Sequence, residues 1–161
     1  MVRCAMIAAV YTVVSLVLAP LTFNAVQIRF AEALCLLPVI CPQAVAGVTL
    51  GCLLTNLLGS VPVDALFGTL ATLVAAVAAR ALRNIRWRGL PVLSALCPVA
   101  ANGLIVGWEI TWFFMGIHTV GPVLFWNMAS VAIGEAIACL GLGLALVKAV
   151  EKNDALRRLF E

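Results

Sequence analysis

Acidic and amide side chains interrupt the apolar stretches of this chain, and they are the residues best suited to chemistry. The acids are Glu32, Asp64, Glu109 and Glu135, and the amides are Gln27, Asn56, Asn102 and Asn127. A carboxylate accepts hydrogen bonds and can take two at once from adjacent N–H groups. Arg29 is the one base that accompanies the set. The surplus of acceptors predicts a pocket for a cation or for a ligand rich in N–H donors.

Two of the acids have structural alternatives that the spacing leaves open. Arg29 and Glu32 could pair across one helical turn, with the arginine reaching the membrane surface. We favour Glu32 as a pocket residue that Arg29 orients. Asp64 follows Pro62 and could cap a helix.

The other two acids have no base within their own helices to neutralise them. We therefore expect Glu109 and Glu135 to contact the ligand, since acids inside a membrane segment are usually functional. Asn102 lies seven residues before Glu109 and shares its helix face. Trp112 follows Glu109 by one turn and could stack on a planar ligand.

The elements that must position these groups are membrane helices. The chain has 161 residues, of which 65% are hydrophobic and 11% charged, and its mean hydropathy is +1.16. A soluble domain is about half apolar, so this composition predicts an all-α, multi-pass membrane protein. We expect a single membrane domain over 1–161.

Charge-free runs set the number of spans. Residues 33–63 carry no charge and would measure about 46 Å as one helix, beyond a ~30 Å hydrocarbon core. Pro42 offers a break in this run. Six spans then place nearly every basic residue and both termini in the cytoplasm, as the positive-inside rule favours. The predicted helices are 3–19, 27–41, 43–59, 62–83, 91–114 and 122–147.

This topology places most of the polar set in the outer half of the bundle. The pattern predicts a pocket open to the outside rather than a pore. Arg29 is the exception to the charge rule, since it lies near the outer start of the second helix. Small residues at GxxxG spacing indicate close helix packing. Ala5 and Ala9 on the first helix could instead face a partner in the membrane.

Several classes of function are not supported by any motif. The sequence has no GxxxxGK[ST] phosphate loop, no HExxH zinc motif, and a single histidine, His118. The six cysteines lack metal-ligand spacing and are read as small buried hydrophobic residues. We therefore expect no enzyme activity, no cofactor, no bound metal and no nucleic-acid partner.

Several longer motifs resemble the QueT family, the substrate-binding S components of energy-coupling factor (ECF) transporters for queuosine precursors. The resemblance runs over about residues 4–147. Its motifs are QIRFAEALCLLP at 27–38, GVTLGCLLTNLLG at 47–59, DALFGTLATLVAA at 64–76, PVAANGLIVGWE at 98–109 and SVAIGEAIACLGLGLAL at 130–146.

The resemblance implies a six-helix S component in a bacterial cell membrane, with an outward-facing pocket. It implies a membrane coupling subunit and two cytoplasmic ATPases as partners, with Ala5 and Ala9 as the docking pair. The segment 21–27 resembles the gate over the pocket, and the implied ligands are 7-deazaguanines, some with an aminomethyl arm. The whole S component is expected to tip within the membrane during transport.

Two other hypotheses stay open. The chain could be a stand-alone secondary carrier that uses Glu109 or Glu135 as a proton relay. It could also be an S component for another vitamin-like solute.

Overall fold

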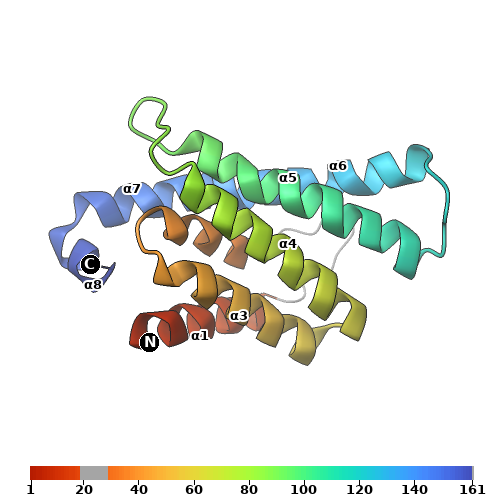
Figure 1. The fold of residues 1–161 in the computed structure, drawn as a ribbon, viewed down its shortest axis with the longest axis horizontal. Coiled ribbons are helices and arrows are strands. Elements are labelled where there is room, and N and C mark those ends of the chain that lie inside the picture. Colours follow the sequence, from red (N-terminus) through yellow and green to blue (C-terminus); the bar gives the residue numbers. More distant parts are fainter. Residues whose placement is uncertain (19–28, 161) are drawn as a thin grey trace.

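The computed structural model describes residues 1–18 and 29–160, which form a bundle of helices (Figure 1). No strand occurs in this described part; Trp87 and Leu90 form only an isolated bridge. The all-helical class predicted from the sequence is confirmed. The elements are α1 (Val2–Val17), η1 (Phe30–Val39), α3 (Gln43–Gly59), α4 (Pro62–Ala81), α5 (Val92–Glu109), η2 (Ile110–Phe114), α6 (Pro122–Ala136), η3 (Ile137–Gly143), α7 (Leu144–Lys152) and α8 (Asp154–Phe160).

Three helical stretches among the described residues are long and apolar enough to cross a membrane. They are Pro62–Ala81, Val92–Phe114 and Pro122–Lys152. The last runs through α6, η3 and α7 without a break, and its 31 residues would measure about 46 Å at ~1.5 Å per residue. This length exceeds a ~30 Å hydrocarbon core, so the helix is longer than a membrane crossing needs. The helices α1, η1 and α3 are apolar but shorter.

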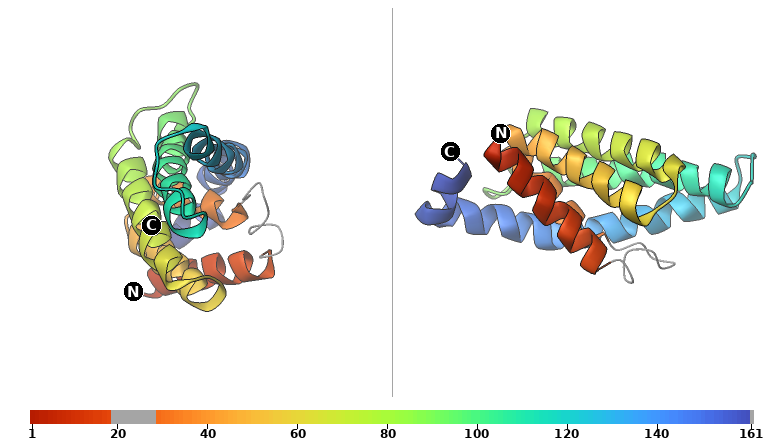
Figure 2. Two further views of the ribbon diagram at one scale, coloured as in Figure 1. Left: turned by 90° about the vertical axis from the view of Figure 1, so that its right-hand side faces the viewer. Right: turned by 90° about the horizontal axis from the view of Figure 1, so that it is seen from below.

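The segment η1 is a ten-residue 3-10 helix that runs through the middle of the bundle. It contacts α1, α3 and α4 on one side and η3 and α7 on another, and Figure 2 shows it between these elements. Cys35 and Leu36 have no exposed surface. Arg80 of α4 donates to the carbonyl oxygens of Pro38 and Val39 at 2.9 and 3.2 Å. This central position carries the polar side chains of η1 into the interior.

Close helix pairs around η1 depend on glycine. A Cβ atom at Gly51 of α3 would lie 2.7 Å from the Tyr11 Cβ atom of α1, and one at Gly107 of α5 would lie 2.6 Å from the Met128 Cα atom of α6. Larger residues would push these helices apart, because such short contacts are not tolerated. Small residues at these positions let helix backbones approach in lipid.

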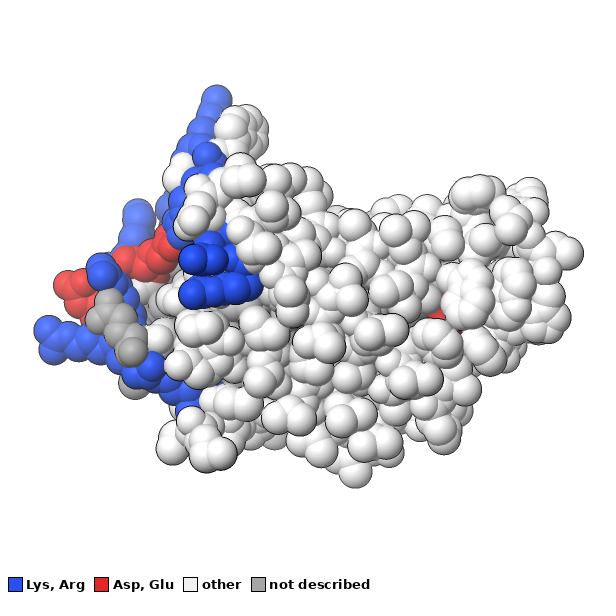
Figure 3. All heavy atoms as spheres, viewed as in Figure 1, with Lys and Arg blue, Asp and Glu red and all other residues white. Residues whose placement is uncertain are grey.

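Charge is concentrated at one end of the molecule. Lysine and arginine side chains gather around loop 82–91, α7 and α8, while the visible body is almost free of charge (Figure 3). Both chain ends lie toward this basic end (Figure 1). Loop 82–91 contains a tight turn in which Arg88 (φ 52°) and Gly89 (φ 80°) have positive φ, as a two-residue reversal of type I′ requires.

Candidate functional site

The Glu32 carboxylate lies at the centre of the bundle and receives hydrogen bonds from the chain itself. Tyr11 of α1 donates its hydroxyl to Oε1 at 2.5 Å, and Thr72 of α4 donates to the same oxygen at 3.3 Å. The Cys35 thiol donates to Oε2 at 2.7 Å. Glu32 has no exposed surface. This carboxylate therefore joins α1, η1 and α4 through buried hydrogen bonds.

Arg29 pairs with Asp64 rather than with Glu32. Its Nη2 atom lies 3.5 Å from Asp64 Oδ1, and the two side chains are 9% and 8% exposed. Ser60 donates its hydroxyl to Asp64 Oδ2 at 2.7 Å, and the Asn56 amide donates to the Asp64 carbonyl oxygen at 3.0 Å. Among the described residues no ion pair joins Arg29 to Glu32. The expectation that Arg29 orients Glu32 is corrected: tertiary packing brings it to a different acid.

A cavity of about 130 Å³ lies beside this ion pair. It is lined by Arg29, Ser60 and Asp64 on one side and by Glu109 and apolar residues of α5 and η2 on the other. Glu109 is fully buried, and neither of its carboxylate oxygens has a hydrogen-bond partner among the described residues. An unpaired buried polar group costs about 1–3 kcal/mol, and more when it is charged. The cavity thus places an unsatisfied acceptor beside the Arg29–Asp64 pair.

A second group of unpaired polar atoms lies deeper, between α5 and α6. Asn102 and Glu135 have no exposed surface, and their side chains lie next to each other. Neither amide atom of Asn102, nor Glu135 Oε1, has a hydrogen-bond partner in the described part of the chain. The Cys139 thiol makes a long contact of 3.8 Å to Glu135 Oε2. Both a donor and acceptors are therefore available here.

Each of the two acids with an unpaired carboxylate oxygen stands next to a π-helical segment. Glu109 is the last residue of α5, directly before η2, and Glu135 is the second-last residue of α6, just before η3. A π turn changes the direction in which the following side chains point, and such turns occur often at functional sites. The helix irregularities therefore coincide with the residues that have unmet hydrogen-bonding capacity.

Two other candidates make contacts within the protein. The Asn127 amide donates to the Thr111 hydroxyl at 3.0 Å and to the Met115 sulfur at 3.4 Å, which ties α6 to η2 and to the turn after it. Trp112 stacks on Trp108 with ring centroids 5.4 Å apart. It is half-buried and does not line the cavity beside Glu109.

The remaining candidates fall elsewhere. Gln27 and the gate segment 21–27 lie outside the described residues. Ala5 and Ala9 are exposed on α1, whereas Ala8 between them is buried. The exposed pair therefore lies on the outward surface of that helix.

Sequence reasoning missed the donors to Glu32. Tyr11 is the only tyrosine in the chain, and a buried tyrosine hydroxyl usually requires a partner, which was an available signal. Cys35 was read as a small hydrophobic residue, yet its thiol contacts Glu32. No local sequence pattern indicates the hydrogen bond from Thr72, because forty residues separate it from Glu32.

The charge balance of the buried residues is strongly acidic. Arg29 is the only base among the buried polar residues of the described part, against Glu32, Asp64, Glu109 and Glu135. The described residues contain no cluster of His, Cys, Asp or Glu that could hold a metal ion. Such an interior suits a ligand that brings positive charge or N–H donors.

Helices long and apolar enough to span a bilayer, together with buried polar groups beside a cavity, are typical of membrane proteins that bind a small solute. The family comparison agrees: residues 1–152 match the model of the QueT transporter family, so the chain belongs to this family. No curated protein and no solved structure matches the chain. The family gives the protein a role in membrane transport.

Proposed function

We propose that the chain is the substrate-binding S component of an ATP-driven ECF importer that binds a queuosine precursor or a related 7-deazaguanine from outside the cell. Membership of the QueT transporter family supports this proposal. The observation that carries it is the state of Glu109, a fully buried carboxylate with both oxygens unpaired at the edge of a cavity.

The ligand chemistry matches the groups that are available. A guanine-like ring presents a ring N–H and an exocyclic NH₂ on one edge, and a carboxylate accepts both as a bidentate pair. The carbonyl oxygen of the same ring is an acceptor that the Asn102 amide could satisfy. An aminomethyl arm would add a positive charge, which the acid surplus favours.

The unpaired groups stand at two depths in the bundle. Asn102 precedes Glu109 by seven residues on α5, so the two are about 10 Å apart along the helix axis. Glu135 lies beside Asn102. A flat ligand with donors at both ends, as in an aminomethyl 7-deazaguanine, could contact both levels. The cavity is smaller than the ~300–1,000 Å³ of typical ligand pockets, so binding requires it to widen.

We also propose six membrane crossings in the bacterial cell membrane, with both termini in the cytoplasm. The gathering of basic side chains and both chain ends at one end of the molecule supports this orientation. The cavity is lined by Ser60 between α3 and α4, by Asp64 in the first turn of α4 and by Phe114 at the end of η2. In this orientation these segments face outside.

The proposed partners are a membrane coupling subunit and two cytoplasmic ATPases. The exposure of Ala5 and Ala9 on α1 supports docking at this surface, because small residues allow close helix contact. An Ala9→Leu variant should bind the ligand as the wild type does but should lose most uptake. Loss of ligand binding in this variant would contradict a docking role for Ala9.

A stand-alone secondary carrier is the second candidate. Its support is the same two buried acids with unpaired oxygens, since Glu109 or Glu135 could relay a proton. Purification of the chain from its native membrane separates the two functions. An S component should copurify with ATPase subunits, and its uptake should persist when the proton gradient is collapsed.

The test of the proposed function is calorimetric titration of the purified protein. The panel is a set of 7-deazaguanines with guanine, biotin, riboflavin and thiamine as comparison ligands. We expect tight binding of at least one 7-deazaguanine and weak or no binding of the others. Absence of a signal with every 7-deazaguanine would overturn the assignment, and tight binding of a vitamin would favour an S component for another solute.

A further inference from the structure

The cavity beside Glu109 has an aromatic side chain at its edge. Phe114, the last residue of η2, lines this cavity together with Glu109 and Ile110. Phe114 is 54% exposed, so the protein covers only part of its ring. Flat heterocyclic ligands are bound in proteins by stacking on such a ring and by hydrogen bonds to their edge. The cavity therefore has both kinds of group that a flat ligand requires.

The π geometry of η2 brings Phe114 to the same side as Glu109. Phe114 follows Glu109 by five residues, and in an α-helix two side chains at this spacing point about 140° apart. A π turn has i→i+5 hydrogen bonds and contains more residues, so positions five apart come close to one face. The Met115 N–H donates such a bond to the Ile110 carbonyl oxygen at 3.0 Å. The irregular helix thus explains why Phe114 reaches the cavity.

The two aromatic residues before Phe114 pack elsewhere. Trp112 stacks on Trp108 with ring centroids 5.4 Å apart, and the ring centroid of Phe113 lies 5.4 Å from that of Phe67 on α4. Neither Trp112 nor Phe113 lines the cavity. The segment therefore divides three consecutive aromatic residues: two belong to a cluster with α4 and α5, and Phe114 borders the cavity.

Hydrogen bonds hold the residues on both sides of Phe114. The Asn127 amide of α6 donates to the Thr111 hydroxyl at 3.0 Å and to the Met115 sulfur at 3.4 Å. The Ile117 N–H donates to the Thr111 carbonyl oxygen at 3.0 Å. These contacts fix the end of η2, whereas the partly exposed ring of Phe114 can rotate as the cavity widens. Phe114 therefore combines a fixed backbone with a movable side chain.

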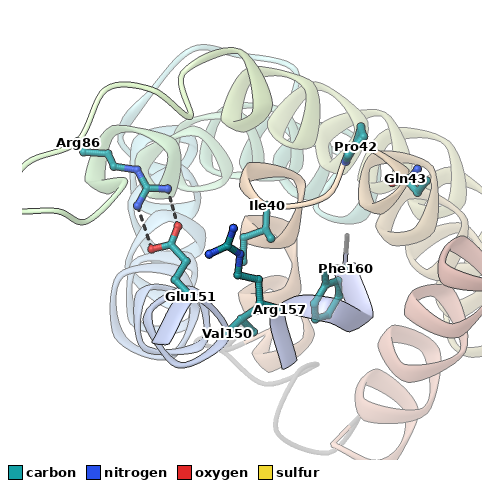
Figure 4. Close-up of a pocket in the computed structure, with 8 residues that line it drawn as sticks. All are labelled: Ile40, Pro42, Gln43, Arg86, Val150, Glu151, Arg157 and Phe160. Carbon is teal, nitrogen blue, oxygen red and sulfur yellow. Dashed lines mark hydrogen bonds and ion pairs between the residues drawn. The ribbon is translucent and has the colours of Figure 1, made fainter. Parts of the chain in front are cut away.

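The larger cavity at the basic end of the molecule has a different arrangement. Its volume is about 690 Å³, and it is also lined by an aromatic residue, Phe160 of α8 (Figure 4). Its acid, Glu151, already accepts two hydrogen bonds from Arg86, at 2.9 and 2.5 Å. Glu109 accepts none from the described residues. An aromatic side chain and an unpaired acid thus occur together at the smaller cavity.

We propose that Phe114 is the stacking residue of the ligand site, with the flat ring of the transported ligand against its face and the N–H edge of the same ring at Glu109. Stacking uses the face of a ring and hydrogen bonding uses its edge, so one ring makes both contacts at once. Phe114 takes the role that the sequence suggested for Trp112. This role rests on the proposed function, because it requires a flat ligand in the cavity beside Glu109.

The test is calorimetric titration of the purified full-length protein with the same panel of 7-deazaguanines, including the 7-aminomethyl derivative. Phe114→Ala should weaken binding of the tightest compound about tenfold, as expected for the loss of an aromatic ring on which a base stacks. Phe114→Tyr keeps the ring and should change the affinity less than about twofold. Phe113→Ala is the matched control, because Phe113 is 50% exposed and does not line the cavity. It should leave the affinity unchanged.

A spectroscopic measurement separates stacking from a general effect on the fold. At saturating protein, the ultraviolet absorbance of the ligand should decrease with the wild type and with Phe114→Tyr, because stacked rings absorb less than separate ones. It should not decrease with Phe114→Leu, and an equal decrease there would overturn the role of Phe114. Unchanged affinity of Phe114→Ala, or an equal loss in Phe113→Ala, would also overturn this role and leave the proposed function standing. If the wild type binds none of the 7-deazaguanines, the proposed function and this role both fail.

Discussion

Glu32 and Glu109 are both fully buried acids in the same bundle, yet their surroundings differ completely. Glu32 receives hydrogen bonds from Tyr11, Thr72 and Cys35. Glu109 receives none from the described residues. Burial alone therefore does not distinguish an acid that holds the fold together from one that is available to a ligand. The presence of donors from neighbouring helices does.

The difference follows from what packs around each carboxylate. Glu32 lies on η1, which α1, α3 and α4 surround, so donors reach it from several directions. Glu109 lies at the end of α5 where the helix changes to π geometry, beside a cavity rather than a packed helix. An acid facing a cavity can remain unpaired until a ligand arrives, whereas a carboxylate surrounded by packed helices is stabilised by the donors that those helices bring.

The largest effect on stability is expected for Glu32→Gln. The amide NH₂ of glutamine would face hydroxyl or thiol donors, so at least one buried hydrogen bond would be lost and a donor left unpaired. We expect the free energy of unfolding in detergent to fall by about 3 kcal/mol, measured by chemical denaturation. Glu151→Gln, at an exposed ion pair, is the control and should cost less than about 1 kcal/mol. If the free energy of unfolding fell equally in the two variants, Glu32 would have no special role in stabilising the fold.

Glu135→Gln should have an intermediate effect, on binding rather than on stability. The Glu135 Oε1 atom has no partner among the described residues, so replacement by a neutral amide removes little that stabilises the fold. We expect ligand affinity to fall about tenfold, which corresponds to about 1.4 kcal/mol. The free energy of unfolding should stay equal or rise. A large fall in the free energy of unfolding would show that Glu135 stabilises the fold, as Glu32 does.

The smallest effect is expected for Tyr11→Phe, which removes one donor to Glu32 and keeps the ring. Hydrogen bonds between membrane helices contribute about 0.6–1.7 kcal/mol, so the free energy of unfolding should fall by about 1 kcal/mol. Ligand affinity should be unchanged, as calorimetric titration of the folded variant can show. A variant that binds more weakly at unchanged stability would place Tyr11 in the ligand site.

The helical class could be predicted from the sequence because lipid requires every backbone group to be paired within helices. The burial of the acids inside the bundle could be predicted for a related reason, because it is costly to place a charged side chain in the hydrocarbon layer. Both inferences depend on composition along the chain, which a single sequence contains.

The pairing of the polar groups could not be predicted in the same way. Arg29 lies three residues from Glu32, yet packing turns it to Asp64 on another helix. The 3-10 form of η1 and the π segments after Glu109 and Glu135 also depend on neighbouring helices rather than on local propensity. The acid on the 3-10 segment meets donors, and each of the two acids before a π segment keeps an unpaired carboxylate oxygen.

The most direct test of this account is calorimetric titration of Glu109→Gln beside the wild type, with the 7-deazaguanine that binds best. Loss of a carboxylate that accepts two N–H groups should weaken binding about 10- to 100-fold, or ~1.4–2.7 kcal/mol. The unfolding midpoint without ligand should be unchanged or higher, because an unpaired buried acid has been removed. An unchanged affinity would contradict the proposal that the unpaired acid beside the cavity binds the transported ligand.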